Sequence, residues 1–88
     1  MSQSIWKFKL EITDRQIVPM PLKALILSVG VQRGSLCLWA RVNTEAEVAD
    51  REIEIIGTGH QIRPDGRRYI GTAIMEPFVW HVFERPAE

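Results

Sequence analysis

The sequence predicts an all-β fold, a small antiparallel β-sandwich or partly open barrel of about seven short strands. Three observations support this prediction. Many short segments alternate apolar and polar residues, turn residues recur about every 8–12 positions, and no segment has a convincing helical pattern. With 88 residues, of which 45% are hydrophobic, the chain is expected to form a single β-domain over residues 1–88.

Strands are expected at 5–12, 15–19, 24–32, 35–42, 51–57, 67–75 and 77–84. The first alternates most cleanly, with Trp6 and Phe8 on one face and Lys7 and Lys9 on the other. Segment 15–19 is expected to pair back on this strand. Pro19 and Pro21 suit an edge strand, because a missing N–H costs no hydrogen bond there. The last strand is apolar on both faces, so it is expected to be central or sandwiched.

Segments 24–32 and 35–42 are expected to form the hairpin on which the rest of the chain packs. The first is apolar almost throughout, so both of its faces should be covered. The turn at Arg33-Gly34 is predicted to be a type I turn with a G1 bulge, because Gly34 accepts a positive φ that Arg33 disfavours. Alternation places Trp39 opposite Leu38, where it could line a pocket or an interface.

Two connections show clear loop chemistry. Segment 44–49 is too short for an independent helix and is expected to be a loop, although Thr44 and Glu47 have the spacing of a capping box. Pro64-Asp65-Gly66 predicts a turn, because proline presets the first φ and glycine accepts a positive one.

Charge and composition exclude several classes of function. Eleven basic residues balance eleven acidic ones, so overall charge does not favour non-specific binding of nucleic acid. The chain has no apolar run of about 18 residues and no signal-peptide pattern, and its one cysteine cannot form an internal disulfide. We therefore expect a cytoplasmic protein with no membrane association. The small core makes a homo-oligomer the expected state.

The charges are nevertheless segregated along the sequence. Five acidic residues lie between Thr44 and Glu54, whereas three arginines lie between His60 and Arg68. Ordinary solvated charge on neighbouring strands accounts for this pattern. A basic rim around an anion site, or a self-complementary dimer surface, is the more specific but less favoured interpretation.

One loop is the candidate ligand-binding site. Glycines on either side of a threonine could let backbone N–H groups converge on an anion, and nearby arginines could close on the same ligand. An aromatic ring could stack on a base. The candidate residues are Gly57, Thr58, Gly59, His60, Arg63, Arg67, Arg68, Trp39 and Tyr69. A strand bulge that needs glycine for its backbone alone is the competing interpretation.

No catalytic motif is recognisable, and neither a metal nor a cofactor is expected. His60 and His81 lack the spacing of metal ligands, and Cys37 sits among apolar residues where a thiol is usually inert. A small hydrolase that uses His60 or His81 is the least favoured alternative, because no nucleophile motif accompanies either histidine.

Several motifs, in order, resemble a family of small uncharacterised proteins encoded by bacteriophages and prophages. They are Trp6-Lys7-Phe8, Pro19-Met20-Pro21, Cys37-Leu38-Trp39-Ala40, Gly57-Thr58-Gly59-His60, Tyr69-Ile70-Gly71-Thr72 and His81-Val82-Phe83-Glu84. The resemblance implies a phage origin and a cytoplasmic setting in an infected bacterium, but no activity.

Phage context and residues together give two expectations for function. The first is a non-enzymatic accessory protein that binds and neutralises a host-defence component, in its sharpest form an oligomeric sponge for an anionic nucleotide signal. The alternative is a protein–protein interaction module, either an inhibitor of a host protein or a minor virion component. This module would present an exposed sheet face or edge strand to its partner.

Overall fold

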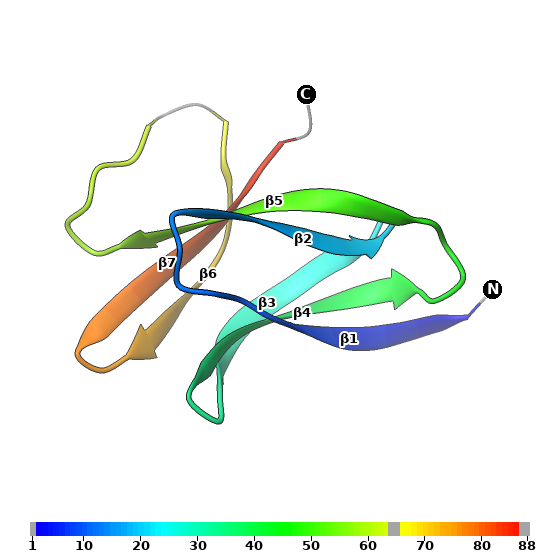
Figure 1. The fold of residues 1–88 in the computed structure, drawn as a ribbon, viewed down its shortest axis with the longest axis horizontal. Coiled ribbons are helices and arrows are strands. Elements are labelled where there is room, and N and C mark those ends of the chain that lie inside the picture. Colours follow the sequence, from blue (N-terminus) through cyan, green and yellow to red (C-terminus); the bar gives the residue numbers. More distant parts are fainter. Residues whose placement is uncertain (1, 64–65, 87–88) are drawn as a thin grey trace.

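The computed structural model describes residues 2–63 and 66–86, which form seven strands and no helix (Figure 1). The strands are β1 (Gln3–Lys9), β2 (Arg15–Pro21), β3 (Leu25–Gln32), β4 (Ser35–Asn43), β5 (Val48–Gly57), β6 (Arg68–Met75) and β7 (Phe78–Arg85). No described segment forms a helix that could span a membrane. The all-β prediction is confirmed, and of its two architectures the structure adopts the sandwich.

Two antiparallel sheets make up the sandwich. The three-stranded sheet, called sheet A here, has the order β1-β4-β3, and the four-stranded sheet, called sheet B, has the order β2-β5-β7-β6. β1 pairs with β4 from Gln3↔Asn43 onward, and β2 pairs with β5 from Arg15↔Glu54 onward. The expected pairing of segment 15–19 with the first strand is therefore wrong. The connection after β1 carries the chain from one sheet to the other, so the two strands belong to different sheets.

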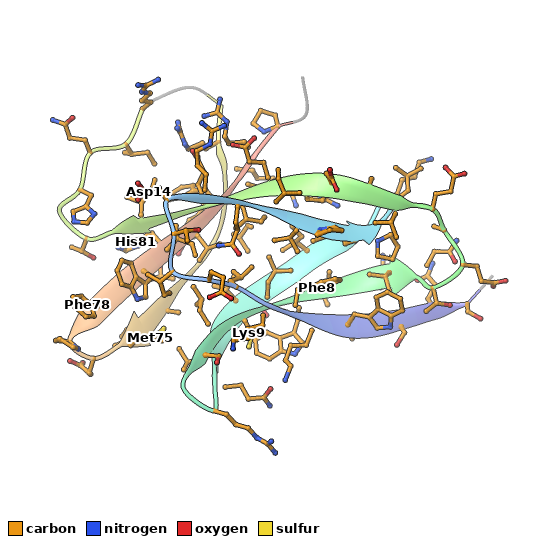
Figure 2. The ribbon with its side chains drawn as sticks, viewed as in Figure 1. Phe8, Lys9, Asp14, Met75, Phe78 and His81 are labelled. Carbon is orange, nitrogen blue, oxygen red and sulfur yellow. The ribbon has the colours of Figure 1, made fainter. Side chains whose placement is uncertain are left out.

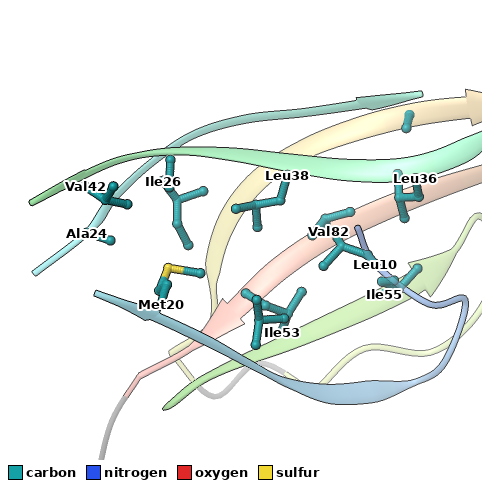
Figure 3. Close-up of a cluster of buried hydrophobic side chains, with 13 residues drawn as sticks. Leu10, Met20, Ala24, Ile26, Leu36, Leu38, Val42, Ile53, Ile55 and Val82 are labelled. Carbon is teal, nitrogen blue, oxygen red and sulfur yellow. The ribbon is translucent and has the colours of Figure 1, made fainter. Parts of the chain in front are cut away.

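The core lies between the sheets and is built from alternate residues of each strand (Figure 3). On β4, Leu36, Leu38, Ala40 and Val42 point inward and are almost completely buried. Sheet B contributes Val18, Met20, Ile53, Ile55 and Val82 to the same cluster. Period-two alternation therefore predicts the inward residues of these strands correctly. On β5, for example, Ile53 and Ile55 point into the core, whereas Glu52 and Glu54 point to the other face of the sheet.

The structure corrects three details of the predicted strands. β1 ends at Lys9, so Ile12 lies outside it and is 45% exposed. β5 begins at Val48, inside the predicted loop, because Pro21 and Val48 form the last pair of the β2–β5 ladder. β3 is an edge strand of sheet A, not a covered one, and Leu25, Leu27 and Val31 are between 43% and 46% exposed.

The position of the β3–β4 turn is confirmed, but its predicted type is wrong. Gln32 pairs with Ser35, and both residues between them have positive φ, 51° at Arg33 and 76° at Gly34. A two-residue loop with two positive φ angles is a type I′ turn, whose twist matches that of the flanking strands. The hairpin geometry therefore outweighs the unfavourable φ of Arg33.

Two predictions about strand position are confirmed. β7 lies between β5 and β6, as its two apolar faces indicate. β2 is an edge strand, and its even-numbered residues turn their backbone groups toward β5, because Ile55 N–H donates to Asp14 O and Leu22 N–H donates to Glu47 O. Pro19 and Pro21 therefore face away from β5. Of the predicted turn at 64–66, Pro64 and Asp65 lie outside the described residues, and Gly66 has a φ of 76°.

Candidate functional site

The bend Gly57–His60 begins at the last residue of β5, and each of its two glycines has a structural explanation. A Cβ at Gly57 would lie 3.2 Å from the His60 ring and 3.2 Å from Trp80 Cζ3, and Gly59 has a φ of 92°. Thr58 N–H donates to Val79 O, and His60 N–H donates to Gly57 O. Two of the backbone donors that an anion would need are therefore already engaged.

Two of the three arginines of the candidate site, Arg67 and Arg68, lie beside carboxylates. Arg67 forms an almost fully buried ion pair with Glu54, and its Nη1 also donates to Arg63 O at 2.6 Å. Arg68 is more exposed, with its Nη2 4.0 Å from Glu84 Oε1. The acidic and basic stretches of the sequence thus meet in space through the Arg67–Glu54 pair.

The two candidate aromatic residues lie on different sheets. Trp39 projects from the outer face of sheet A and covers Gly30, where a Cβ would lie 3.4 Å from Trp39 Cζ3. Tyr69 projects from the outer face of sheet B and packs on Phe83, with the ring centroids 5.4 Å apart. Trp39 is therefore on the expected face of its strand, but it is not brought together with the arginines.

Only part of the predicted constellation lines a common hollow. His60, Arg63 and Arg67 border a surface cavity of about 240 Å³, together with Asp14 and Glu54. Trp39, Arg68 and Tyr69 do not border it, nor do Gly57, Thr58 and Gly59. The two carboxylates in the wall of this cavity stand beside three arginines, Arg15, Arg63 and Arg67.

His81 is the centre of a polar chain that the sequence did not indicate. Its Nε2 lies 2.7 Å from Thr58 Oγ1 and its Nδ1 lies 3.0 Å from Thr72 Oγ1, while Tyr69 OH lies 2.5 Å from Thr72 Oγ1. Figure 2 labels His81 on β7, between the neighbouring strands. A hydroxyl beside an imidazole is the arrangement of a nucleophile and its base, but the four residues of this polar chain, Thr58, His81, Thr72 and Tyr69, include no carboxylate to orient the ring.

Metal ligation has no support in the part of the chain that the structure describes, which contains no group of three or more His, Cys, Asp or Glu residues able to hold an ion. Cys37 is 2% exposed, in agreement with its predicted role as a buried apolar group.

The free edge of β1 is a further candidate site. Six of its seven residues are exposed, and Phe8 is the only partly buried one. Thr44 N–H donates to Ser2 O, and Leu10 N–H donates to Leu36 O, so even-numbered residues turn their backbone groups toward β4. The backbone groups of Gln3, Ile5, Lys7 and Lys9 therefore face away from β4. Alternation in β1 was visible in the sequence, but its position at an edge was not.

Both faces of β1 are open as well as its edge. Ile5, on the outer face of sheet A, is 61% exposed, and Trp6, on the inner face, is 39% exposed. Trp6 pairs with the fully buried Ala40, which shows that the cover provided by sheet B ends between β4 and β1. In Figure 1, β1 accordingly runs along one margin of the molecule.

These features define a small all-β sandwich in which the edge strand β1 is exposed along almost its whole length. The chain belongs to a family described as "Domain of unknown function (DUF7352)", whose model matches residues 1–88. The search of curated proteins returned no match, and neither did the search of solved structures.

Proposed function

We propose that this chain is a non-enzymatic, phage-encoded interaction module that binds and neutralises a protein of the host bacterium. In this proposal β1 accepts an extended segment of the partner, which adds a strand to sheet A through main-chain hydrogen bonds. The observation that carries the proposal is the exposed state of β1 along its edge and on both faces. The phage setting rests on the motif resemblance alone.

The other edge strands support this choice. β3 and β6 lie side by side, with Gly71 close to Val29, so each of these edges has the other strand beside it. β2 is also an edge strand, but Pro19 and Pro21 remove two outward N–H groups from it. β1 contains no proline in its seven residues. An added strand can therefore form a continuous ladder on β1 and cannot form one on β2.

The nucleotide-sponge form of the expected function has weaker support. Glu54 already accepts from Arg67, Glu84 lies 4.0 Å from Arg68, and Trp39 is on the opposite sheet from both arginines. A phosphate that used Arg67 or Arg68 would have to displace or share these carboxylates. We therefore favour the protein-binding module.

A matched pair of proline variants tests the module. Ile5 and Ile17 are both exposed isoleucines in edge strands, and both have backbone groups that face away from the paired strand. Ile5→Pro removes an outward N–H from β1, whereas Ile17→Pro removes one from β2. Tagged proteins are expressed in infected bacteria, crosslinked and purified, and the captured host polypeptide is then titrated in pure form.

We expect Ile5→Pro to weaken binding of that polypeptide at least about tenfold and Ile17→Pro to leave it unchanged. Circular dichroism melting confirms that both variants fold. Equal binding by wild type and Ile5→Pro would contradict the role of β1. Native mass spectrometry distinguishes the protein-binding module from the nucleotide sponge, because an oligomer that releases a small molecule on denaturation would favour the sponge.

A further inference from the structure

The two sheets carry different charge. The strands of sheet A contain Lys7, Lys9 and Arg41 and no acidic residue, which gives this sheet a formal charge of +3. The strands of sheet B contain four arginines and four acidic residues, Asp50, Glu52, Glu54 and Glu84, which gives zero. The neutral total of the whole chain thus hides one basic sheet.

The basic residues of sheet A lie together on its outer face. Lys7 is paired with Trp39, and Arg41 follows two residues later on β4, so all three share one face. Lys7 Nζ donates to Gln32 Oε1 at 2.8 Å, which is a neutral acceptor and does not compensate its charge. Lys9 is also exposed and follows Lys7 by two residues on β1, so it lies on the same face.

We propose that β1 selects an extended acidic segment with carboxylates at two alternate positions. This inference rests on the proposed function, because it assumes that a strand adds to the β1 edge. Side chains directly opposite each other on neighbouring strands have their Cβ atoms about 5 Å apart. Carboxylates two residues apart on the added strand would therefore stand beside Lys7 and Lys9, as cross-strand pairs of opposite charge.

The inner face of the same segment has a different requirement. The residue between the two carboxylates stands opposite Phe8, and the residue on the far side of the Lys7 partner stands opposite Trp6. Both point to the other face of the sheet, where the ring centroids of Trp6 and Phe8 lie 6.5 Å apart. Trp6 is the more exposed of the two, so an apolar side chain beside it would bury the open part of its ring. The segment therefore alternates acidic and apolar residues.

A second copy of this chain does not fit the edge as well. β1 itself has no carboxylate, so β1–β1 pairing would leave Lys7 and Lys9 of both copies without counter-charges. The acidic stretch of the chain is also committed elsewhere, since Glu52 and Glu54 lie in β5 between β2 and β7. Charge complementarity thus points to a foreign acidic strand.

Labelled seven-residue peptides with blocked ends test the charge rule by fluorescence anisotropy. One peptide alternates valine and glutamate, a second alternates valine and lysine, and a third has the composition of the first with its glutamates adjacent. The protein variant is Lys7→Glu with Lys9→Glu. The control is Lys23→Glu with Arg33→Glu, which changes net charge equally at two exposed turn residues outside the strands.

We expect the alternating glutamate peptide to bind wild type and the control about tenfold more tightly than it binds the β1 variant. The lysine peptide should show the opposite order, and the clustered peptide should bind wild type more weakly than the alternating one. Added salt should reduce these differences, because the charge pairs are exposed.

Equal binding of the glutamate and lysine peptides by wild type would overturn the charge rule. If the host polypeptide still binds in a manner that Ile5→Pro abolishes, the interaction module stands and only the acidic segment is wrong. A homodimer that Ile5→Pro dissociates in sedimentation would instead make the second copy the occupant. If neither peptide nor polypeptide responds to Ile5→Pro, both proposals fail.

Discussion

Arg67 and Glu54 form an ion pair that is almost entirely withdrawn from solvent, with side chains only 8% and 7% exposed. Arg67 precedes β6, and Glu54 lies in the middle of β5 on the outer face of sheet B. Arg85 adds a second guanidinium 3.6 Å from Glu54 Oε2. The pair thus anchors the chain that enters β6 to the centre of the sheet.

Removal of the Glu54 charge should destabilise the protein strongly. Glu54→Gln removes a buried counter-charge from the Arg67 guanidinium, and we expect a loss of about 3 kcal/mol in the free energy of unfolding, measured with urea. Arg15→Gln is the matched control, because the Arg15 side chain is 60% exposed where it meets Glu52. It should cost less than about 1 kcal/mol. Equal losses in both variants would show that burial does not govern this pair.

Gly71 on β6 lies close to Val29 on β3, where the two sheets meet. A Cβ at Gly71 would lie 2.9 Å from Val29 Cγ2, and the β-branched side chain of Val29 has little rotamer freedom with which to move away. Gly71→Ala should therefore lower the free energy of unfolding by about 1–3 kcal/mol. In the Val29→Ala background the same change should cost less. Strict additivity in this double-mutant cycle would contradict the contact.

Arg33 is a site for stabilisation. Its φ of 51° in a type I′ turn is unfavourable for arginine, whereas asparagine followed by glycine is the preferred pair in such turns. We expect Arg33→Asn to raise the free energy of unfolding by about 0.5 kcal/mol, a gain that chemical denaturation can detect. A lower stability would indicate that the Arg33 side chain makes a contact of greater value than the turn preference.

Pro19 protects the edge of β2. Pro19→Val would restore an outward N–H on an exposed edge strand, and we expect self-association at high concentration, measured by light scattering. Ile17→Val is the control, because it changes an exposed side chain of the same strand without changing the backbone. A monomeric Pro19→Val variant would mean that other features protect this edge.

Much of the fold was predictable because strand patterns are local. Alternation located all seven strands to within a few residues, and the prolines of β2 indicated an edge. Partner choice was not predictable in the same way. The pattern of β1 shows which face is buried, but not that its neighbour is β4 and not β2. Likewise, the apolar β3 looked covered, although its position at the end of sheet A leaves part of it exposed.

The candidate site was harder to predict, because its charges depend on contacts between separate strands. Arg67 looked available for an anion until the β5–β7 and β6–β7 ladders brought Glu54 and Glu84 to the same region. The hydrogen bonds of His81 could not be predicted, because they depend on β6 and the bend after β5, which place Thr72 and Thr58 on either side of its ring. Lys7 and Lys9 were assigned correctly to one face. That their sheet contains no acidic residue could be seen only once its strands, β1, β4 and β3, were known.

The pairing of β1 with β4 and of β2 with β5 has a consequence for how the chain matures during synthesis. The hairpins β3–β4 and β6–β7 can close between adjacent segments, whereas Gln3 must find Asn43 and Arg15 must find Glu54. The N-terminal segment is made first, yet its two strands have no partners until β4 and β5 have left the ribosome. Closing these long loops is slow relative to hairpin formation. The earliest-made part of the chain should therefore be the last to find its place in the sandwich.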